Sequence, residues 1–180
     1  MLALEMQPTL ARALLMVDPA MVANDTSRLM KLPFMPHLMR SRIPIARTAG
    51  RRRADFPASE EVLNSYQGRG AFKTWLPGFL EDYVEDGFVR RSDGSVTLRC
   101  TPAWESATFA AQRHDLRSAM RALKVPARML VAERGSTSER VIPLLEELAP
   151  AVAVERVPGT THFVPMEQPE LVRARMLALL

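Results

Sequence analysis

The stretch that decides the fold is residues 127–162, ARMLVAERGSTSERVIPLLEELAPAVAVERVPGTTH. Its two apolar runs, 127–132 and 151–157, are short and continuous, which is typical of strands buried on both faces of a parallel sheet. The leucine-rich segment 138–148 between them predicts a helix, with a kink or a late start at Pro143. The order strand, helix, strand predicts a parallel α/β unit.

The same pattern continues on both sides of this stretch. The run ALLMV at 13–17, closed by Asp18 and Pro19, predicts another buried strand, and residues 1–6 predict a helix. Residues 169–180 carry apolar side chains at helical spacing after a proline suited to a first helical turn. We therefore expect the α/β class, with a short parallel sheet covered by helices.

Residues 21–123 follow a different pattern. They contain short helical stretches interrupted by six prolines, and one hairpin is predicted from 88–91 and 95–98 around Asp93-Gly94. A mostly helical excursion between two buried parallel strands predicts a lid placed over the carboxyl edge of the sheet. The expected domains are a core of 1–20 and 124–180 and a lid, or cap, of 21–123.

Length and composition exclude several classes of protein. The chain has 180 residues, 47% hydrophobic and 24% charged, which fits one folded domain rather than a disordered chain. Cys100 is the single cysteine, so no intrachain disulfide or cysteine-based zinc site can form. No apolar run reaches the roughly 18 residues of a membrane span, and the N-terminus lacks signal-peptide features. We expect a cytoplasmic protein without membrane association, metal or cofactor.

The net charge of +4 raises the question of nucleic-acid binding. Three of the 24 basic residues are lysines, so 21 are arginines, and most alternate with acidic residues. The exception is a cluster formed by Arg40, Arg42, Arg47, Arg51, Arg52 and Arg53. This cluster lacks interleaved aromatic residues and any helix-turn-helix or zinc spacing, so we expect a solvated loop and no specific nucleic-acid partner. A nucleic-acid site there would instead bind less tightly as salt rises.

His162 is the histidine placed for chemistry. It directly follows a predicted buried strand, at the carboxyl end of the sheet where α/β proteins bind their ligands. His37 and His114 lie in an apolar stretch and a polar one, where packing or solvent exposure explains them. Asp18 and Glu133 also end predicted strands and point to the same rim, although Asp18 could be a turn cap and Glu133 a salt-bridge partner.

No nucleophile of the expected kind is present. The sequence holds no Gly-x-Ser-x-Gly, nor the same motif with Cys or Asp at its centre. Ser136 and Ser138 are explained as helix caps, and Cys100 as a buried thiol. Apolar residues of the predicted lid suggest a pocket for a small apolar substrate, although such residues are more often ordinary core. The candidate substrate-binding residues are Phe34, Met35, Trp75 and, beside the histidine, Phe163.

Four segments together resemble the C-terminal portion of an α/β-hydrolase, the superfamily of lid-bearing esterases, lipases and epoxide hydrolases. The segments are 13–19, 21–123, 125–133 and 158–169, and the last of them is similar to the family's histidine loop. The resemblance implies that His162 is the catalytic base. Many relatives carry an aspartate where this chain has Gly135, whereas some take the acid from the preceding strand end, so Asp18 ranks above Glu133.

The resemblance also implies a partial fold and a reaction. The family's nucleophile would lie upstream of Met1, so we expect a fragment, inactive alone, of a hydrolase that transfers an acyl group to that serine. The strand at 13–17 would then have an uncovered edge, through which the chain could self-associate. The alternative is a non-catalytic module that binds a small ligand or a partner.

Overall fold

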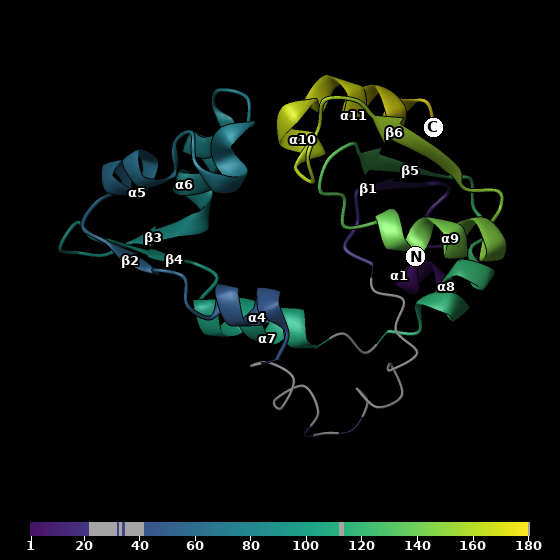
Figure 1. Ribbon diagram of the computed structural model, residues 1–180, viewed down its shortest axis with the longest axis horizontal. Helices are drawn as coiled ribbons and strands as arrows, with labels where there is room; N and C mark the ends of the chain where they lie inside the picture. The colour runs from purple at the N-terminus through teal and green to yellow at the C-terminus, as the bar shows by residue number, and fades with distance from the viewer. Residues whose placement is uncertain (22–31, 33, 35–41, 112–113, 180) are drawn as a thin grey trace. The chain divides into compact units, whose positions relative to one another are not determined.

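A computed structural model describes residues 1–21, 32, 34, 42–111 and 114–179 (Figure 1). The chain forms two compact units. The sheet unit comprises Met1–Asn24 and His114–Leu180, and the insert unit comprises Asp25–Arg113. The helix at 116–122 belongs to the sheet unit in this division.

The sheet unit is built on three parallel strands. These are β1 (Leu14–Val17), β5 (Ala127–Ala132) and β6 (Ala153–Val157), in the order β1-β5-β6. The parallel α/β prediction is therefore confirmed, with β1 and β6 starting one and two residues later than expected. The central strand β5 is the most buried of the three, as expected for a continuous apolar run covered on both faces.

Helices cover both faces of this sheet (Figure 1). The helical elements are α1 (Leu2–Met6), α8 (Leu116–Ala122), the 3-10 turn η2 (Glu139–Val141), α9 (Ile142–Leu148), α10 (Val164–Glu167) and α11 (Pro169–Leu177). Helix α9 starts late, as expected, because Pro143 occupies its first turn, where no main-chain N–H is needed inside the helix.

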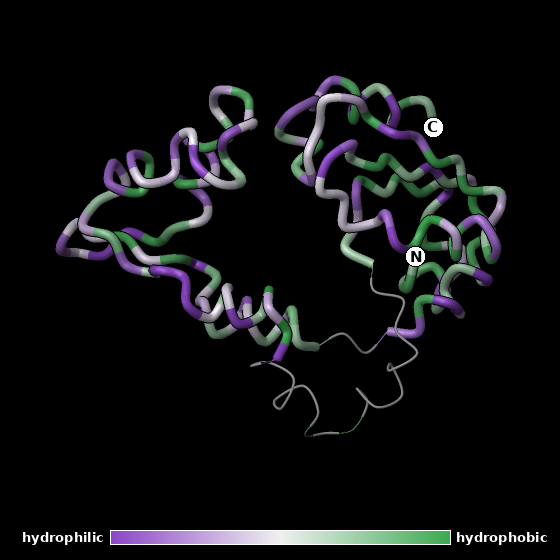
Figure 2. Tube along the Cα trace, in the orientation of Figure 1, coloured by the Kyte–Doolittle hydropathy of each residue, from purple (hydrophilic) through white to green (hydrophobic). Residues whose placement is uncertain are grey.

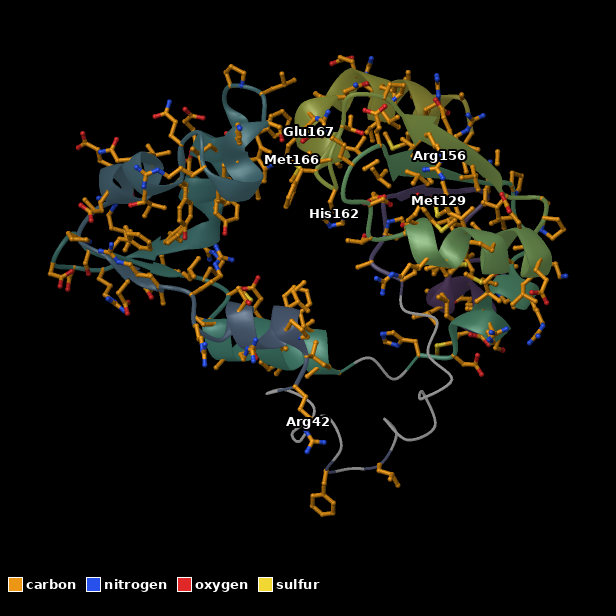
Figure 3. The ribbon with its side chains drawn as sticks, in the orientation of Figure 1. Arg42, Met129, Arg156, His162, Met166 and Glu167 are labelled. Atoms are coloured by element: carbon orange, nitrogen blue, oxygen red, sulfur yellow. The ribbon has the colours of Figure 1, made fainter. Side chains whose placement is uncertain are left out.

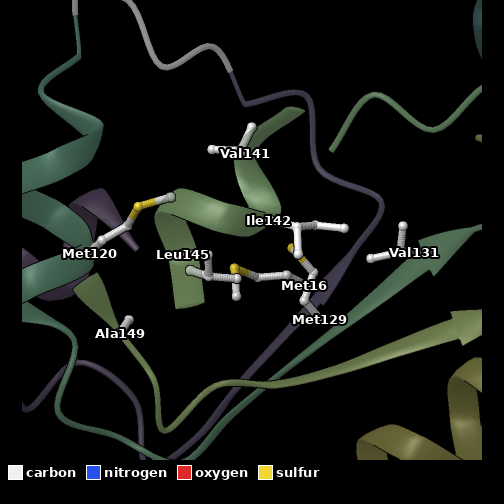
Figure 4. Packing of buried hydrophobic residues seen from close by; sticks show 8 residues of the cluster. All are labelled: Met16, Met120, Met129, Val131, Val141, Ile142, Leu145 and Ala149. Atoms are coloured by element: carbon white, nitrogen blue, oxygen red, sulfur yellow. The ribbon is translucent and has the colours of Figure 1, made fainter. Parts of the chain in front are cut away.

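The side chains of β5 alternate between two cores because successive strand residues point to opposite faces. Met129 and Val131 pack against Leu145 of α9 and Met120 of α8 (Figure 4). Leu130 and Ala132 face the other way, where Val157 and Val164 are buried with them. Figure 2 shows hydrophobic residues along β1 and β5 and hydrophilic residues in the surrounding loops.

The insert unit has its own small sheet. Strands β2 (Asp55–Phe56), β3 (Phe88–Arg90) and β4 (Val96–Leu98) are antiparallel in the order β2-β4-β3. The predicted hairpin is confirmed: Gly94 takes a φ of +86°, and the Asp93 carboxylate accepts hydrogen bonds from the N–H and hydroxyl of Ser95.

The described residues of the insert unit also form five helical segments. They are α4 (Pro44–Ala49), α5 (Ser59–Tyr66), the 3-10 turn η1 (Gly70–Lys73), α6 (Phe79–Gly87) and α7 (Pro102–Ala110). Two arginines of the basic cluster are paired inside this unit. Arg52 contacts Glu105 at 3.3 Å and donates to the Tyr83 hydroxyl at 3.0 Å. Arg53 contacts Glu61 and lies 4.1 Å from the centre of the Phe56 ring. Part of the positive charge therefore stabilises the unit itself.

Cys100 corrects one expectation. Its thiol is exposed rather than buried, because Cys100 lies in a bend two residues beyond β4, where the sheet no longer covers it. None of the described helices is long and apolar enough to cross a membrane.

Candidate active site

The loop between β6 and α10 presents His162, as Figure 3 shows. Gly159 turns the chain after the strand with a φ of +76°, a conformation that favours glycine. At the far end of the loop, the Glu167 carboxylate accepts the main-chain N–H and the hydroxyl of Thr161, both at 2.6 Å. The loop is therefore held on both sides of the imidazole.

Asp18 reaches the same rim from the end of β1. Its N–H continues the strand ladder to the carbonyl of Leu130 at 2.8 Å, and its φ of +37° ends the strand there. A positive φ is uncommon in a residue other than glycine, although aspartate tolerates it better than most. The side chain is fully buried, at 0% exposure.

The structure brings the imidazole and the Asp18 carboxylate into contact. Nδ1 of His162 lies 2.8 Å from Oδ2 of Asp18. The other ring nitrogen, Nε2, hydrogen-bonds to none of the described residues, and the side chain of His162 is 38% exposed. A carboxylate on Nδ1 holds the proton there and leaves the lone pair of Nε2 available to take a proton from a reactant.

Three further donors hold the Asp18 carboxylate. Oδ1 accepts the N–H of Ala132 at 3.1 Å and the hydroxyl of Ser136 at 2.5 Å, and Oδ2 accepts the N–H of Thr137 at 3.1 Å. Burial by itself raises the pKa of Asp18, but the hydrogen bonds from Ser136, His162, Ala132 and Thr137 outweigh it and lower that pKa below the usual range. The buried carboxyl group is therefore ionised at neutral pH.

Glu133, the other candidate acid, has different partners. Its Oε2 accepts the N–H of Gly159 at 3.0 Å, and its carboxylate lies 4.0 Å from the guanidinium of Arg134. Arg134 in turn donates to the carbonyl of Gly159 at 2.9 Å. Both residues thus anchor the start of the histidine loop, and the contact with the imidazole belongs to Asp18.

Ser136 and Thr137 are site residues that the sequence pattern did not identify. The sequence Gly135-Ser136-Thr137-Ser138 after a buried strand predicted helix capping. Ser138 instead donates its hydroxyl to the carbonyl of Pro19 at 2.7 Å and makes no side-chain cap to η2. The cap prediction was wrong for Ser138 because the loop packs against the end of β1, where that carbonyl needs a donor.

The candidate substrate-binding residues lie in different surroundings. The Phe163 ring meets the His162 ring edge to face, with centroids 5.3 Å apart. Trp75 packs against Phe72 and Tyr83 in the aromatic core of the insert unit. Phe34 is 83% exposed, and Met35 lies outside the described residues.

The described residues form no metal site beside the histidine, and none of their serine or cysteine side chains hydrogen-bonds to the imidazole. No group of three or more His, Cys, Asp or Glu side chains among them could hold a metal ion. The Ser136 hydroxyl is engaged by Asp18. The arrangement pairs an exposed imidazole with a buried, ionised carboxylate.

No protein-family model matches the sequence, and no curated protein matches it significantly. Solved structures do resemble it. The peroxisomal α/β-hydrolase Lpx1 of Saccharomyces cerevisiae has a TM-score of 0.72 at 17% identity, over 96% of this chain and 46% of its own. E-2-(acetamidomethylene)succinate hydrolase has a TM-score of 0.73 at 20% identity, over 98% of this chain and 60% of its own.

An esterase of M. tuberculosis is also similar, with a TM-score of 0.60 at 18% identity, over 97% of this chain and 56% of its own. At such identities the likeness concerns the fold. In each of the three comparisons the chain spans between about half and three fifths of the length of the structure it matches.

Proposed function

Because the chain has the fold of the C-terminal portion of α/β-hydrolases, we propose that it carries the base and the acid of a serine hydrolase. His162 is the base and Asp18 the acid that orients it. The observation that carries this proposal is the 2.8 Å contact between Nδ1 of the exposed imidazole and the buried carboxylate.

The nucleophile in this proposal is a serine upstream of Met1 in a longer polypeptide. One observation supports that location: the similar hydrolases are longer than this chain, which spans 46% and 60% of two of them. The chain without that segment is then inactive.

The chemistry is acyl transfer in two steps. Nε2 of His162 takes the serine hydroxyl proton as the oxygen attacks the substrate carbonyl, and the imidazolium then returns that proton to the leaving group. Water, activated by the same nitrogen, releases the acyl group in the second step. Asp18 stays ionised throughout and stabilises the imidazolium, which the lowered pKa of its carboxyl group favours.

The substrate class that fits best is a small apolar ester. Phe163 supports this because its ring forms an apolar surface beside the base. Esters need no charged partner near the reacting carbonyl, and Asp18 is the one charged side chain among the described residues that contacts the imidazole.

The test begins with the genomic sequence upstream of the Met1 codon, where we expect an in-frame Gly-x-Ser-x-Gly. The extended polypeptide should hydrolyse short-chain p-nitrophenyl esters and should be labelled on that serine by a fluorophosphonate. His162→Ala should reduce kcat by about 10³-fold or more. His114→Ala, which removes an exposed histidine of the same unit, is the matched control and should keep full activity.

Full activity in the His162→Ala variant would contradict the proposed base. An extended polypeptide that binds an apolar ester tightly but neither hydrolyses it nor reacts with the fluorophosphonate would favour a non-catalytic binding module instead.

A further inference from the structure

The loop after β5 contributes more to the site than a connection between strand and helix. We propose that Thr137 is a positioning residue, whose hydroxyl fixes the proton on Nδ1 of His162 and holds the ring against Asp18. The inference deepens the proposed function, because it concerns the same histidine.

The direction of the Thr137 hydrogen bonds carries the argument. The hydroxyl lies 2.9 Å from the main-chain carbonyl oxygen of Asp18 and 3.2 Å from Nδ1 of His162. A carbonyl oxygen can only accept, so the single proton of the Thr137 hydroxyl points to the main-chain carbonyl of Asp18. Toward the imidazole, the Thr137 oxygen can then only accept a proton.

Two acceptors therefore face Nδ1 of His162. One is the Thr137 hydroxyl oxygen, and the other is Oδ2 of the ionised Asp18, 2.8 Å away. Both require a proton on Nδ1, so a neutral imidazole keeps its lone pair on Nε2. The Asp18 carboxylate alone would set the same tautomer. The second acceptor, Thr137 in the loop after β5, also restricts rotation of the ring.

The same loop prevents the carboxylate from turning away. The Ser136 hydroxyl donates to Oδ1 of Asp18 and accepts the N–H of Ser138 at 3.1 Å, while the N–H of Thr137 holds Oδ2. Residues 136 and 137 thus touch both oxygens of Asp18, and Thr137 also touches the imidazole.

The other charged side chains near the site have partners of their own. Glu139 pairs with Arg156 at 2.7 Å, Glu133 accepts the N–H of Gly159, and Glu167 accepts from Thr161. A change at Thr137 therefore acts on His162 through the hydrogen bond and through Asp18, and no described lysine or arginine contacts the imidazole.

The experiment uses the 180-residue chain and needs no turnover. NMR of nitrogen-15-labelled histidine side chains reports which ring nitrogen carries the proton and how fast that N–H exchanges with water, and His162→Ala assigns the His162 signals. In Thr137→Val we expect the Nδ1–H of His162 to exchange with water several-fold faster, because one of the two acceptors that hold the ring is lost. Thr137→Ser keeps the hydroxyl and should stay close to the wild type.

Thr108→Val is the matched control. It removes a hydroxyl that donates to a main-chain carbonyl, that of Trp104 in the insert unit, and should leave His162 unchanged. If Thr137→Val does not fold, Thr137→Ala must give the same increase in the exchange rate. An unchanged exchange rate of the His162 Nδ1–H in Thr137→Val or Thr137→Ala, or an equal increase in Thr137→Ser, would overturn the role assigned to Thr137.

In the extended polypeptide, Thr137→Val should lower kcat about three- to tenfold with little change in KM. A purely structural role would instead reduce the folded fraction and leave kcat per folded molecule unchanged. If the extended polypeptide is inactive but the Thr137 variants change the His162 NMR signals as expected, the proposed function is rejected and this inference stands.

Discussion

At the scale of single residues, Asp18 combines complete burial with a negative charge. An unpaired carboxylate could not stay ionised there, but four donors meet its two oxygens. Two of these donors are main-chain N–H groups, which cannot leave without unfolding the end of β5 and the loop after it. The charge beside His162 is therefore built into the sheet unit.

This arrangement predicts how stability depends on pH. The pKa of Asp18 is lower in the folded chain than in the unfolded chain, where it is about 3.9. The unfolded state thus binds more protons between the two values, so the stabilisation is complete above about pH 5 and is lost as pH falls through the folded-state pKa. The Tm difference between the wild type and Asp18→Asn should narrow below about pH 4.

Thermal unfolding followed by circular dichroism from about pH 7 to about pH 2.5 measures this difference. Glu133→Gln removes a half-exposed carboxylate from the adjoining loop and serves as the control. A Tm difference between the wild type and Asp18→Asn that stays constant down to the lowest pH would show that the Asp18 charge contributes nothing to stability.

At the scale of elements, β5 organises the sheet unit because its two faces enter different cores. Met129 and Val131 contribute to the core under α8 and α9, and Leu130 and Ala132 to the core under α10. The same strand ends at Ala132, whose N–H binds Asp18. Packing of β5 therefore also sets the position of the Asp18 carboxylate.

Leu145 on α9 tests this packing. It is fully buried in the core that contains Met129. We expect Leu145→Ala to lower the free energy of unfolding by about 2–5 kcal/mol, because a cavity remains beside the sheet. Leu144 is half-buried on the same helix, so Leu144→Ala should cost less. Urea unfolding measures both, and equal losses would contradict the assignment of the core face.

At the scale of the whole molecule, the outer edge of β1 pairs with no other strand in the described part of the chain. The N–H groups of Leu14 and Asp18 bond to the loop before β5 and to β5 itself. Since these groups alternate along a strand, those of Leu15 and Val17 point to the outer edge. Strand edges that are apolar and unpaired promote association.

We therefore expect the 180-residue chain to self-associate as its concentration rises, as measured by sedimentation velocity. Leu15→Pro removes one outward N–H and should weaken association. Leu15→Ala loses comparable apolar contacts but keeps the N–H, so it should associate more than the proline variant. A chain that stays monomeric at about 100 μM would contradict the prediction.

Local patterns were sufficient for most elements and for the place of the site. The apolar runs at 13–17, 127–132 and 151–157 correctly predicted the three parallel strands, and Asp93-Gly94 correctly predicted the hairpin turn. Asp18 and His162 could be placed at one rim because parallel strands share their carboxyl edge, although 144 positions separate them in the chain. Both inferences rest on periodicity and on the order of elements, which are properties of the sequence itself.

The contacts within the site were decided by the tertiary structure. Sequence position left Asp18 and Glu133 as alternatives, and it assigned the serines after β5 to helix capping. Which acid contacts the imidazole depends on the side chains that fill the space between β1 and the loop after β5. The hydroxyls of Ser136 and Thr137, which lie over 100 residues from Asp18 in the chain, fill that space. The periodicity of the sequence determines which face of a strand or helix a residue occupies. Hydrogen-bond partners depend instead on distances between side chains far apart in the sequence, and folding sets those distances.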